Sequence, residues 1–169
     1  ANELFPRVRR FLPPLAICDD DLRSTMNTTL DATRSQPPSV GAALVRTWCN
    51  AWCTETRFGT VASNESQCRM GCASVSGSDS TAHYLQCERL WIPILKEIRD
   101  RTGVCWRPAT VESLAIKRVG REFTVDEIAP RTQALAAALD VYNTTARAQD
   151  NGEKRPITPE RLIERSKEA

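Results

Sequence analysis

The sequence predicts a mainly helical domain, and three observations carry this prediction. Apolar residues recur at intervals of three or four over residues 38–53, 79–100 and 131–148, which is the spacing that lines one face of an α-helix. Residues that favour helix starts, chiefly proline and aspartate, stand before or within the first turn of several segments. With 169 residues, of which 41% are hydrophobic, the chain is long enough to bury the core of one domain.

The first 35 residues are expected to form an extended arm and a short helix. Residues 1–17 mix three prolines with apolar residues in no helical or strand period. We therefore predict an extended arm that lies on a partner or on the domain itself. Aspartates at positions 19–21 favour the first turn of a helix, which we expect to run to about Leu30.

Two amphipathic helices are expected in the next part of the chain. The proline pair at residues 37–38 is suited to the first turn of a helix, where a missing N–H is harmless, and this helix should end near Cys53. The second helix covers residues 79–100. It is expected to kink or divide at Pro93, because proline cannot donate the helical hydrogen bond.

The remaining residues predict a short helix, a long helix, a linker and a final helix. The short helix runs from residue 110 to 116, and the alanine-rich stretch 131–148 gives the clearest helix of the chain. Residues 149–156 are expected to be a charged linker. A last helix, which begins at residues 158–160, has only Leu162 and Ile163 to bury, so it should be loosely attached or dock on a partner. The predicted divisions are an N-terminal arm and helix (1–35), a helical domain (36–148) and a C-terminal tail (149–169).

One short segment gathers residues that bind metals. Cys68 and Cys72, then His83 and Cys87, form the pattern C-x3-C-x10-H-x3-C. Three thiolates and an imidazole can complete a closed tetrahedron around Zn²⁺. A turn at Gly71 lets the first two sulfurs point inward, and the last two ligands are expected one turn apart on a single helix face. We predict a structural zinc site, because four protein ligands leave no open position for activating water.

Two other interpretations of these residues stay open. A lone histidine is usually a satisfied core or surface residue, and His83 is the only histidine of the chain. The cysteines could instead form disulfides, although seven thiols leave at least one unpaired. Cys49 and Cys53 are a second thiol pair without matching partners, and Cys105 is expected to be a small buried apolar residue.

Charge and hydropathy narrow the function classes. The net charge of +2 is less basic than is common for a free-standing nucleic-acid-binding domain. No apolar run approaches the roughly 20 residues of a transmembrane helix.

Because the chain begins at Ala1, we expect a processed product or a fragment of a longer protein. The only histidine is assigned to the metal, so we expect neither hydrolytic chemistry nor a small-molecule substrate.

A wider pattern of residues surrounds the candidate metal site. It comprises PPSV at 37–40, AALVRTW at 42–48, Asn50, WCT at 52–54, Arg57 and Phe58, the four metal-site residues with Tyr84 and Trp91, and VYNTT at 141–145. This pattern resembles the C-terminal zinc-binding segment of reverse transcriptases of non-long-terminal-repeat retroelements, in the versions abundant in dinoflagellate genomes. The resemblance covers roughly residues 36–148.

The resemblance implies roles for individual residues. The four metal-site residues would be zinc ligands, and Trp48, Trp52 and Trp91 would pack in the core. The zinc region would help to grip template RNA or target DNA. Cys49 departs from the family, which tends to have an aromatic residue there, and residues 1–35 have no counterpart.

Catalysis is not implied by the resemblance. Residues 17–20, Ile-Cys-Asp-Asp, look like the paired-aspartate motif of such polymerases. The other polymerase motifs and the endonuclease motifs do not occur in this sequence. We therefore interpret the aspartates as a helix start and predict that the protein is not an enzyme.

Two functions from different classes follow. The first is a retrotransposon-derived, non-catalytic zinc module that binds RNA or DNA through phosphate contacts from Arg46, Arg57, Arg69 and Arg89. The alternative is a structural accessory subunit that the host has recruited into a larger protein assembly. In that case the zinc is purely structural, and the two ends of the chain contact neighbouring subunits.

Overall fold

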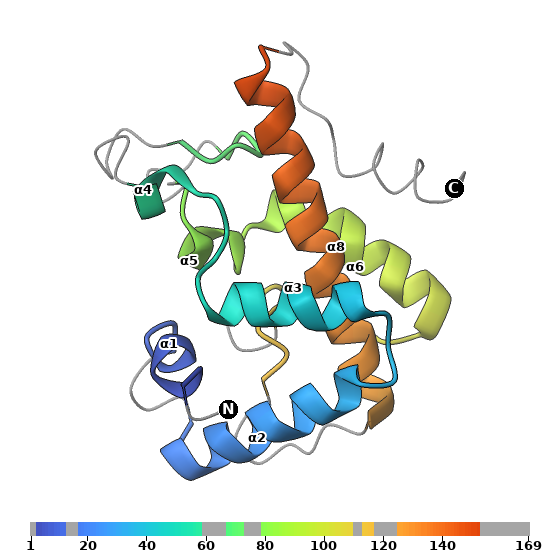
Figure 1. Cartoon of the computed structure of the whole chain (residues 1–169). Coiled ribbons are helices and arrows are strands. Elements are labelled where there is room, and N and C mark those ends of the chain that lie inside the picture. Colours follow the sequence, from blue (N-terminus) through green and yellow to red (C-terminus); the bar gives the residue numbers. More distant parts are fainter. Residues whose placement is uncertain are drawn as a thin grey trace.

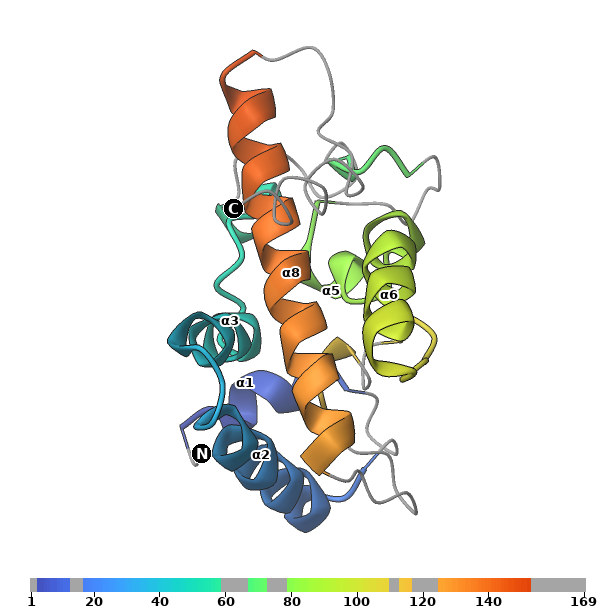
Figure 2. The same ribbon diagram turned by 90° about the vertical axis from the view of Figure 1, so that its right-hand side faces the viewer.

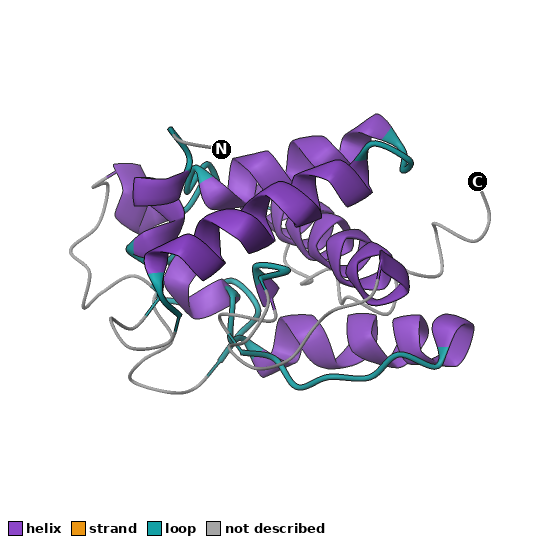
Figure 3. Ribbon diagram, turned by 90° about the horizontal axis from the view of Figure 1, so that it is seen from below, coloured by secondary structure: helices purple, strands orange, loops and turns teal. Residues whose placement is uncertain are grey.

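The computed structural model describes residues 3–12, 17–58, 67–72, 79–109, 113–116 and 125–152. All regular secondary structure in these residues is helical, without a strand, which confirms the predicted fold class (Figure 3). The helices in Figure 1 are α1 (Phe5–Arg9), α2 (Asp19–Thr33), α3 (Pro38–Trp48), α4 (Glu55–Phe58), α5 (Thr81–Tyr84), α6 (Glu88–Thr102) and α8 (Val125–Asp150).

Helix α8 is the axis on which the other long helices pack. Helices α2, α3 and α6 all contact it, and in the view of Figure 2 α3 and α6 lie on opposite sides of it. Its buried face alternates Ala134 and Ala138 with Leu135, Leu139 and Tyr142. The alanines allow neighbouring helices to approach, and the larger side chains fill the space between them.

Helices α2 and α3 begin where the sequence predicts. The Sγ atom of Cys18 accepts a hydrogen bond from the backbone N–H of Asp21 at 3.4 Å, so this cysteine caps the acidic first turn of α2. Pro37 is the N-cap of α3, and Pro38 is its first residue. However, α3 ends at Trp48 instead of near Cys53. Asn50 adopts a left-handed φ of 55°, a conformation that stops a helix.

The extended N-terminal arm was a wrong prediction, because residues 5–9 form helix α1. Phe5, Val8 and Leu12 are spaced by three and four residues and are buried in the core. Pro6 lies in the first turn of this helix, where a proline costs no hydrogen bond. The prolines therefore concealed a short helical period.

The predicted helix over residues 79–100 is two helices, and its break is not at the proline. Helix α5 ends at Tyr84, and Cys87 adopts an extended ψ of 103° as the N-cap of α6. The indole N–H of Trp91 donates a hydrogen bond to the Tyr84 carbonyl at 2.7 Å, which satisfies a carbonyl at the break. Pro93 lies inside α6 without dividing it, although five residues of the helix precede it and it cannot donate a hydrogen bond to the carbonyl of Arg89.

The long C-terminal helix is longer than predicted at both ends. Helix α8 begins at Val125, passes through Pro130 and ends at Asp150, so Gln149 and Asp150 are helical instead of belonging to a linker. Cys105 is exposed, which contradicts its predicted burial. Part of the predicted helix at 110–116, the linker beyond residue 152 and the final helix lie outside the described residues.

Candidate metal centre

The four predicted ligands lie together in space. One ligand atom from each of Cys68, Cys72, His83 and Cys87 lies within 4.8 Å of the others. The Sγ atom of Cys87 is 3.9 Å from that of Cys68 and 3.4 Å from that of Cys72. Sulfurs bound tetrahedrally at about 2.3 Å from a metal ion would lie about 3.8 Å apart. The cluster therefore has nearly the dimensions of a tetrahedral metal site.

A tight turn supplies the first two ligands. The backbone N–H of Gly71 donates to the carbonyl of Cys68 at 2.8 Å, and Gly71 has a left-handed φ of 74°. A Cβ atom at this position would stand 3.1 Å from Nη1 of Arg89. This same nitrogen donates to the carbonyl of Met70 at 3.4 Å. The turn therefore favours glycine through its backbone conformation, and the exposed Arg89 side chain would have to shift slightly to admit a Cβ atom.

The other two ligands come from the break between α5 and α6. His83 lies in α5, where the Ser80 side chain accepts its backbone N–H at 3.2 Å. Cys87 is the N-cap of α6. The prediction that His83 and Cys87 share one helix face is therefore wrong. The chain turns between them, and both side chains reach the turn at residues 68–72.

The surroundings of His83 fit a metal ligand. Its Nε2 atom is buried and has no hydrogen-bond partner among the described residues. Buried imidazole nitrogens are normally paired, because burying an unsatisfied polar atom is costly. All seven cysteines are free thiols, so none forms a disulfide. A metal ion held by three sulfurs and this nitrogen would account for both observations. The free thiols argue against disulfides, and the unpaired Nε2 atom argues against a histidine that is satisfied by hydrogen bonds.

The three thiols influence one another's ionisation. The neighbouring Cys87 thiol lowers the pKa of Cys68 to about 4 by hydrogen bonding, against the opposing effect of burial. The same pairing, together with burial, raises the pKa of Cys87. Burial also raises the pKa of Cys72. Because thiolates are the metal ligands, metal uptake should release protons, chiefly from Cys72 and Cys87.

A buried polar network, which the sequence pattern did not reveal, adjoins the ligands. Arg69, between the first two ligands, forms ion pairs with Asp79 at 3.3 Å, Glu55 at 3.5 Å and Asp150 at 2.9 Å. Burial disfavours the charge of Arg69, but the carboxylates of Asp150 and Asp79 outweigh this effect and raise its pKa. These partners are 10, 14 and 81 residues away along the chain, so no local motif indicates them.

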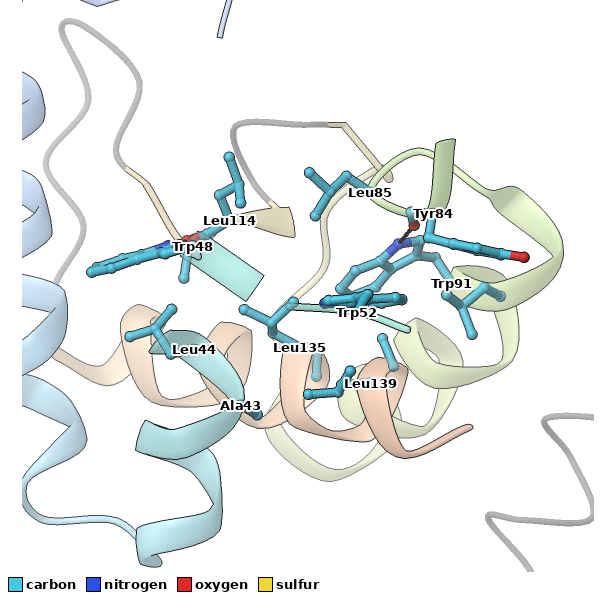
Figure 4. Close-up of a cluster of buried hydrophobic side chains, with 14 of the residues drawn as sticks. Ala43, Leu44, Trp48, Trp52, Tyr84, Leu85, Trp91, Leu114, Leu135 and Leu139 are labelled. Carbon is cyan, nitrogen blue, oxygen red and sulfur yellow. Dashed lines mark hydrogen bonds between the residues drawn. The ribbon is translucent and has the colours of Figure 1, made fainter. Parts of the chain in front are cut away.

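Aromatic side chains pack beside the site. Trp52 stacks on Tyr84 with ring centroids 5.8 Å apart, and Tyr84 lies 4.7 Å from Tyr142. Figure 4 shows Trp52, Tyr84 and Trp91 within the buried cluster, with Trp48 at its other end. All three tryptophans that the resemblance assigns to packing are fully buried, which confirms that role.

The four arginines predicted to contact phosphates are in different environments. Arg46 in α3, Arg57 in α4 and Arg89 in α6 are exposed. The side chain of Arg69 is only 12% exposed, and its guanidinium is already paired with carboxylates. The structure therefore leaves three of the four at the surface, and of these Arg89 adjoins the metal-binding turn.

None of the described helices is both long enough and apolar enough to cross a membrane. Comparisons of the chain with protein-family models, with curated proteins and with solved structures give no match. The relation to retroelement reverse transcriptases is therefore carried by the sequence resemblance alone and stays a prediction.

Proposed function

We propose that this chain is a non-catalytic module that binds one Zn²⁺ through Cys68, Cys72, His83 and Cys87 and contacts nucleic-acid phosphates with its exposed arginines. The observation that carries the metal assignment is the buried, unpaired Nε2 of His83 beside three free thiols. Three sulfurs and one nitrogen are a donor set that suits zinc. When bound, the ion supplies a cross-link between the turn at residues 68–72 and the α5–α6 junction.

The nucleic-acid part of the proposal draws on charge and on the resemblance. Arg46, Arg57 and Arg89 are exposed, and guanidinium groups are well suited to phosphate oxygens. Arg89 also lies against the metal-binding turn, so the metal would hold the surface on which this arginine stands. The resemblance assigns the same region a grip on RNA or DNA. Arg69 is left out of this surface because its charge is compensated internally.

A two-part experiment tests this function. Elemental analysis should find one zinc per chain. Fluorescence anisotropy with labelled single-stranded RNA and duplex DNA should show binding that weakens with salt, with a log–log slope of about −2 to −3 for three phosphate contacts. Binding that ignores salt, or no binding at all, would count against the nucleic-acid role.

Matched variants assign the contacts. Replacing Arg46, Arg57 and Arg89 together by alanine should weaken binding and flatten the salt slope. Arg34→Ala is the control, because Arg34 is also exposed but lies at the end of α2 and pairs with Asp31. An equal loss of binding free energy per charge removed in the two proteins would indicate a diffuse charge effect instead of a defined surface.

A structural accessory subunit is the second candidate function, and charge is the observation that favours it. The net charge is only +2, and the internal pairing of Arg69 reduces the basic surface further. Ile92 on α6 is 58% exposed, which leaves an apolar side chain available to a neighbouring protein. Stable co-purification with the same protein subunits after nuclease treatment would support this candidate, and a monomer that binds RNA or DNA would count against it.

A further inference from the structure

A fully buried carboxylate lies beside the four candidate metal ligands. Asp79 has no exposed side-chain surface. Its Oδ1 atom accepts the hydroxyls of Tyr84 at 2.7 Å and Tyr142 at 3.3 Å. Its Oδ2 atom accepts the backbone N–H of Glu55 at 2.8 Å and Nε of Arg69 at 3.3 Å. A buried charge with this many partners holds the groups around it in a defined arrangement.

Arg69 connects this carboxylate to the metal-binding turn. Its Nη1 atom donates to Oδ1 of Asp150 at 2.9 Å and to the Ala146 carbonyl at 3.4 Å, both in α8. Its backbone is also held, since its N–H donates to the Tyr84 hydroxyl at 2.9 Å and its carbonyl accepts Nε2 of Gln149 at 3.0 Å. The residue between Cys68 and Cys72 is therefore fixed through both its side chain and its backbone.

The Tyr84 hydroxyl links the two segments that carry the candidate ligands. The Tyr84 hydroxyl bonds both Asp79 and the backbone of Arg69, and Tyr84 directly follows the ligand His83. One network thus joins the turn that carries Cys68 and Cys72 to the helix that carries His83. Neither Arg69 nor Asp79 belongs to the group of ligand atoms.

We infer that Arg69 and Asp79 are positioning residues for the metal centre: their buried ion pair fixes the turn at residues 68–72 so that its two thiols face His83 and Cys87. The inference rests on the proposed zinc site and adds to it. A site whose ligands are already oriented loses less conformational freedom when the metal binds, and outer-shell contacts of this kind raise metal affinity. Loss of Arg69 would leave the buried carboxylate of Asp79 without its cationic partner. Loss of Asp79 would leave Arg69 paired only with Glu55 and Asp150 and no longer tied to the buried carboxylate.

The test measures zinc affinity in variants that keep all four ligands. Arg69→Met and Asp79→Asn should each weaken zinc affinity about 10- to 100-fold in competition with a chromophoric chelator. Arg69→Lys keeps the charge but loses the planar set of donors, so its affinity should fall between those of Arg69→Met and the unmodified chain. Co²⁺-substituted protein gives a second readout, because its visible absorption reports the ligand geometry.

Two controls separate positioning from general stability. Leu22→Ala in α2 removes a fully buried side chain of the same core without touching the turn. It should lower the free energy of unfolding while leaving zinc affinity and the Co²⁺ spectrum unchanged. If Asp79→Asn fails to fold, Tyr142→Phe serves in its place. It removes only the hydroxyl that bonds Asp79 and the Cys53 carbonyl, and it should weaken zinc binding more than Leu22→Ala does.

The outcomes are distinguishable. An unmodified chain that takes up no stoichiometric zinc would overturn the proposed function. Zinc uptake by the unmodified chain, with affinities and Co²⁺ spectra in the Arg69 and Asp79 variants that match those of Leu22→Ala, would overturn only the inference. Weaker zinc binding in the Arg69 and Asp79 variants, with an altered Co²⁺ spectrum, would support it.

Discussion

Individual ligand atoms define the candidate metal centre. The Nε2 atom of His83 is buried without a partner, and the sulfur of Cys72 stands 3.4 Å from that of Cys87. Each of the four ligands would supply a quarter of the coordination shell, so the site should not tolerate the loss of one of them.

We expect Cys72→Ser to abolish stoichiometric zinc binding, because a serine hydroxyl is a poor replacement for a thiolate ligand. Cys49→Ser is the matched control, since Cys49 is a free, partly buried thiol outside the cluster. Elemental analysis of the purified variants should find zinc in the control only. Full occupancy in Cys72→Ser would contradict the ligand assignment.

Gly71 and Gly41 differ in backbone conformation, so replacing each by alanine should change stability in opposite directions. Gly71→Ala should destabilise the protein by about 1–2 kcal/mol, because alanine is disfavoured at a φ of 74° and its Cβ would crowd Arg89. Gly41→Ala in α3 should instead stabilise it by about 0.5–1 kcal/mol, since its Cβ would meet only the Thr33 side chain, at an ordinary 3.7 Å from Oγ1 and 4.0 Å from Cβ. Urea unfolding measures the free energy of unfolding of both variants. Equal changes in the two would contradict the left-handed conformation of Gly71 in the turn.

The tyrosines predict how stability depends on alkaline pH. The chain has two, Tyr84 and Tyr142, and both are fully buried. Burial, reinforced by the carboxylate of Asp79, raises the pKa of each phenol above the usual value of about 10. The folded state therefore keeps protons that the unfolded chain releases. Their contribution to stability is fully present below about pH 10 and is lost as the pH rises further.

Titration monitored by phenolate absorbance should accordingly show little ionisation at pH 10, followed by ionisation of both tyrosines together as the helices unfold. Circular dichroism recorded on the same samples reports the unfolding. Gradual ionisation centred near pH 10, with the helical signal intact, would contradict the buried positions.

At the scale of helices, the sequence was most informative where apolar spacing was regular. The starts of α2 and α3 follow from their aspartates and prolines, and the apolar faces of α3, α6 and α8 follow from their periodicity. The clustering of the four candidate ligands follows from their spacing. The junction between α5 and α6 could not be predicted from the sequence, because apolar residues continue at helical spacing across it. What interrupts the helix is a tertiary contact, the Trp91 indole on the Tyr84 carbonyl, together with the extended backbone of Cys87.

Long-range polar contacts account for the other differences. The carboxylate of Asp79 gave no sequence signal, since its arginine and its second tyrosine are 10 and 63 residues away. Arg69 resembled a surface arginine for the same reason. Spacing along the chain identified the four residues that cluster as candidate metal ligands but not the buried residues that contact them.

Removal of the metal should affect the whole molecule unevenly. Chelation is expected to increase hydrogen exchange in the turn at residues 68–72, in α5 and at the end of α8, which the Arg69 contacts join. Helix α2 should keep its protection, because it packs on α3 and α8. Mass-spectrometric hydrogen exchange with and without a chelator checks this, and a uniform loss of protection would indicate that the metal supports the entire fold.

The stacking of Trp52 on Tyr84 has an optical consequence. His83 and Tyr84 are in edge-on ring contact at 5.4 Å, so the indole lies one aromatic ring away from a ligand of the proposed centre. Exchange of zinc for a paramagnetic, visibly absorbing ion such as Co²⁺ should therefore quench the emission of this tryptophan. The protein would then report the occupancy of its own site by fluorescence, without an added dye.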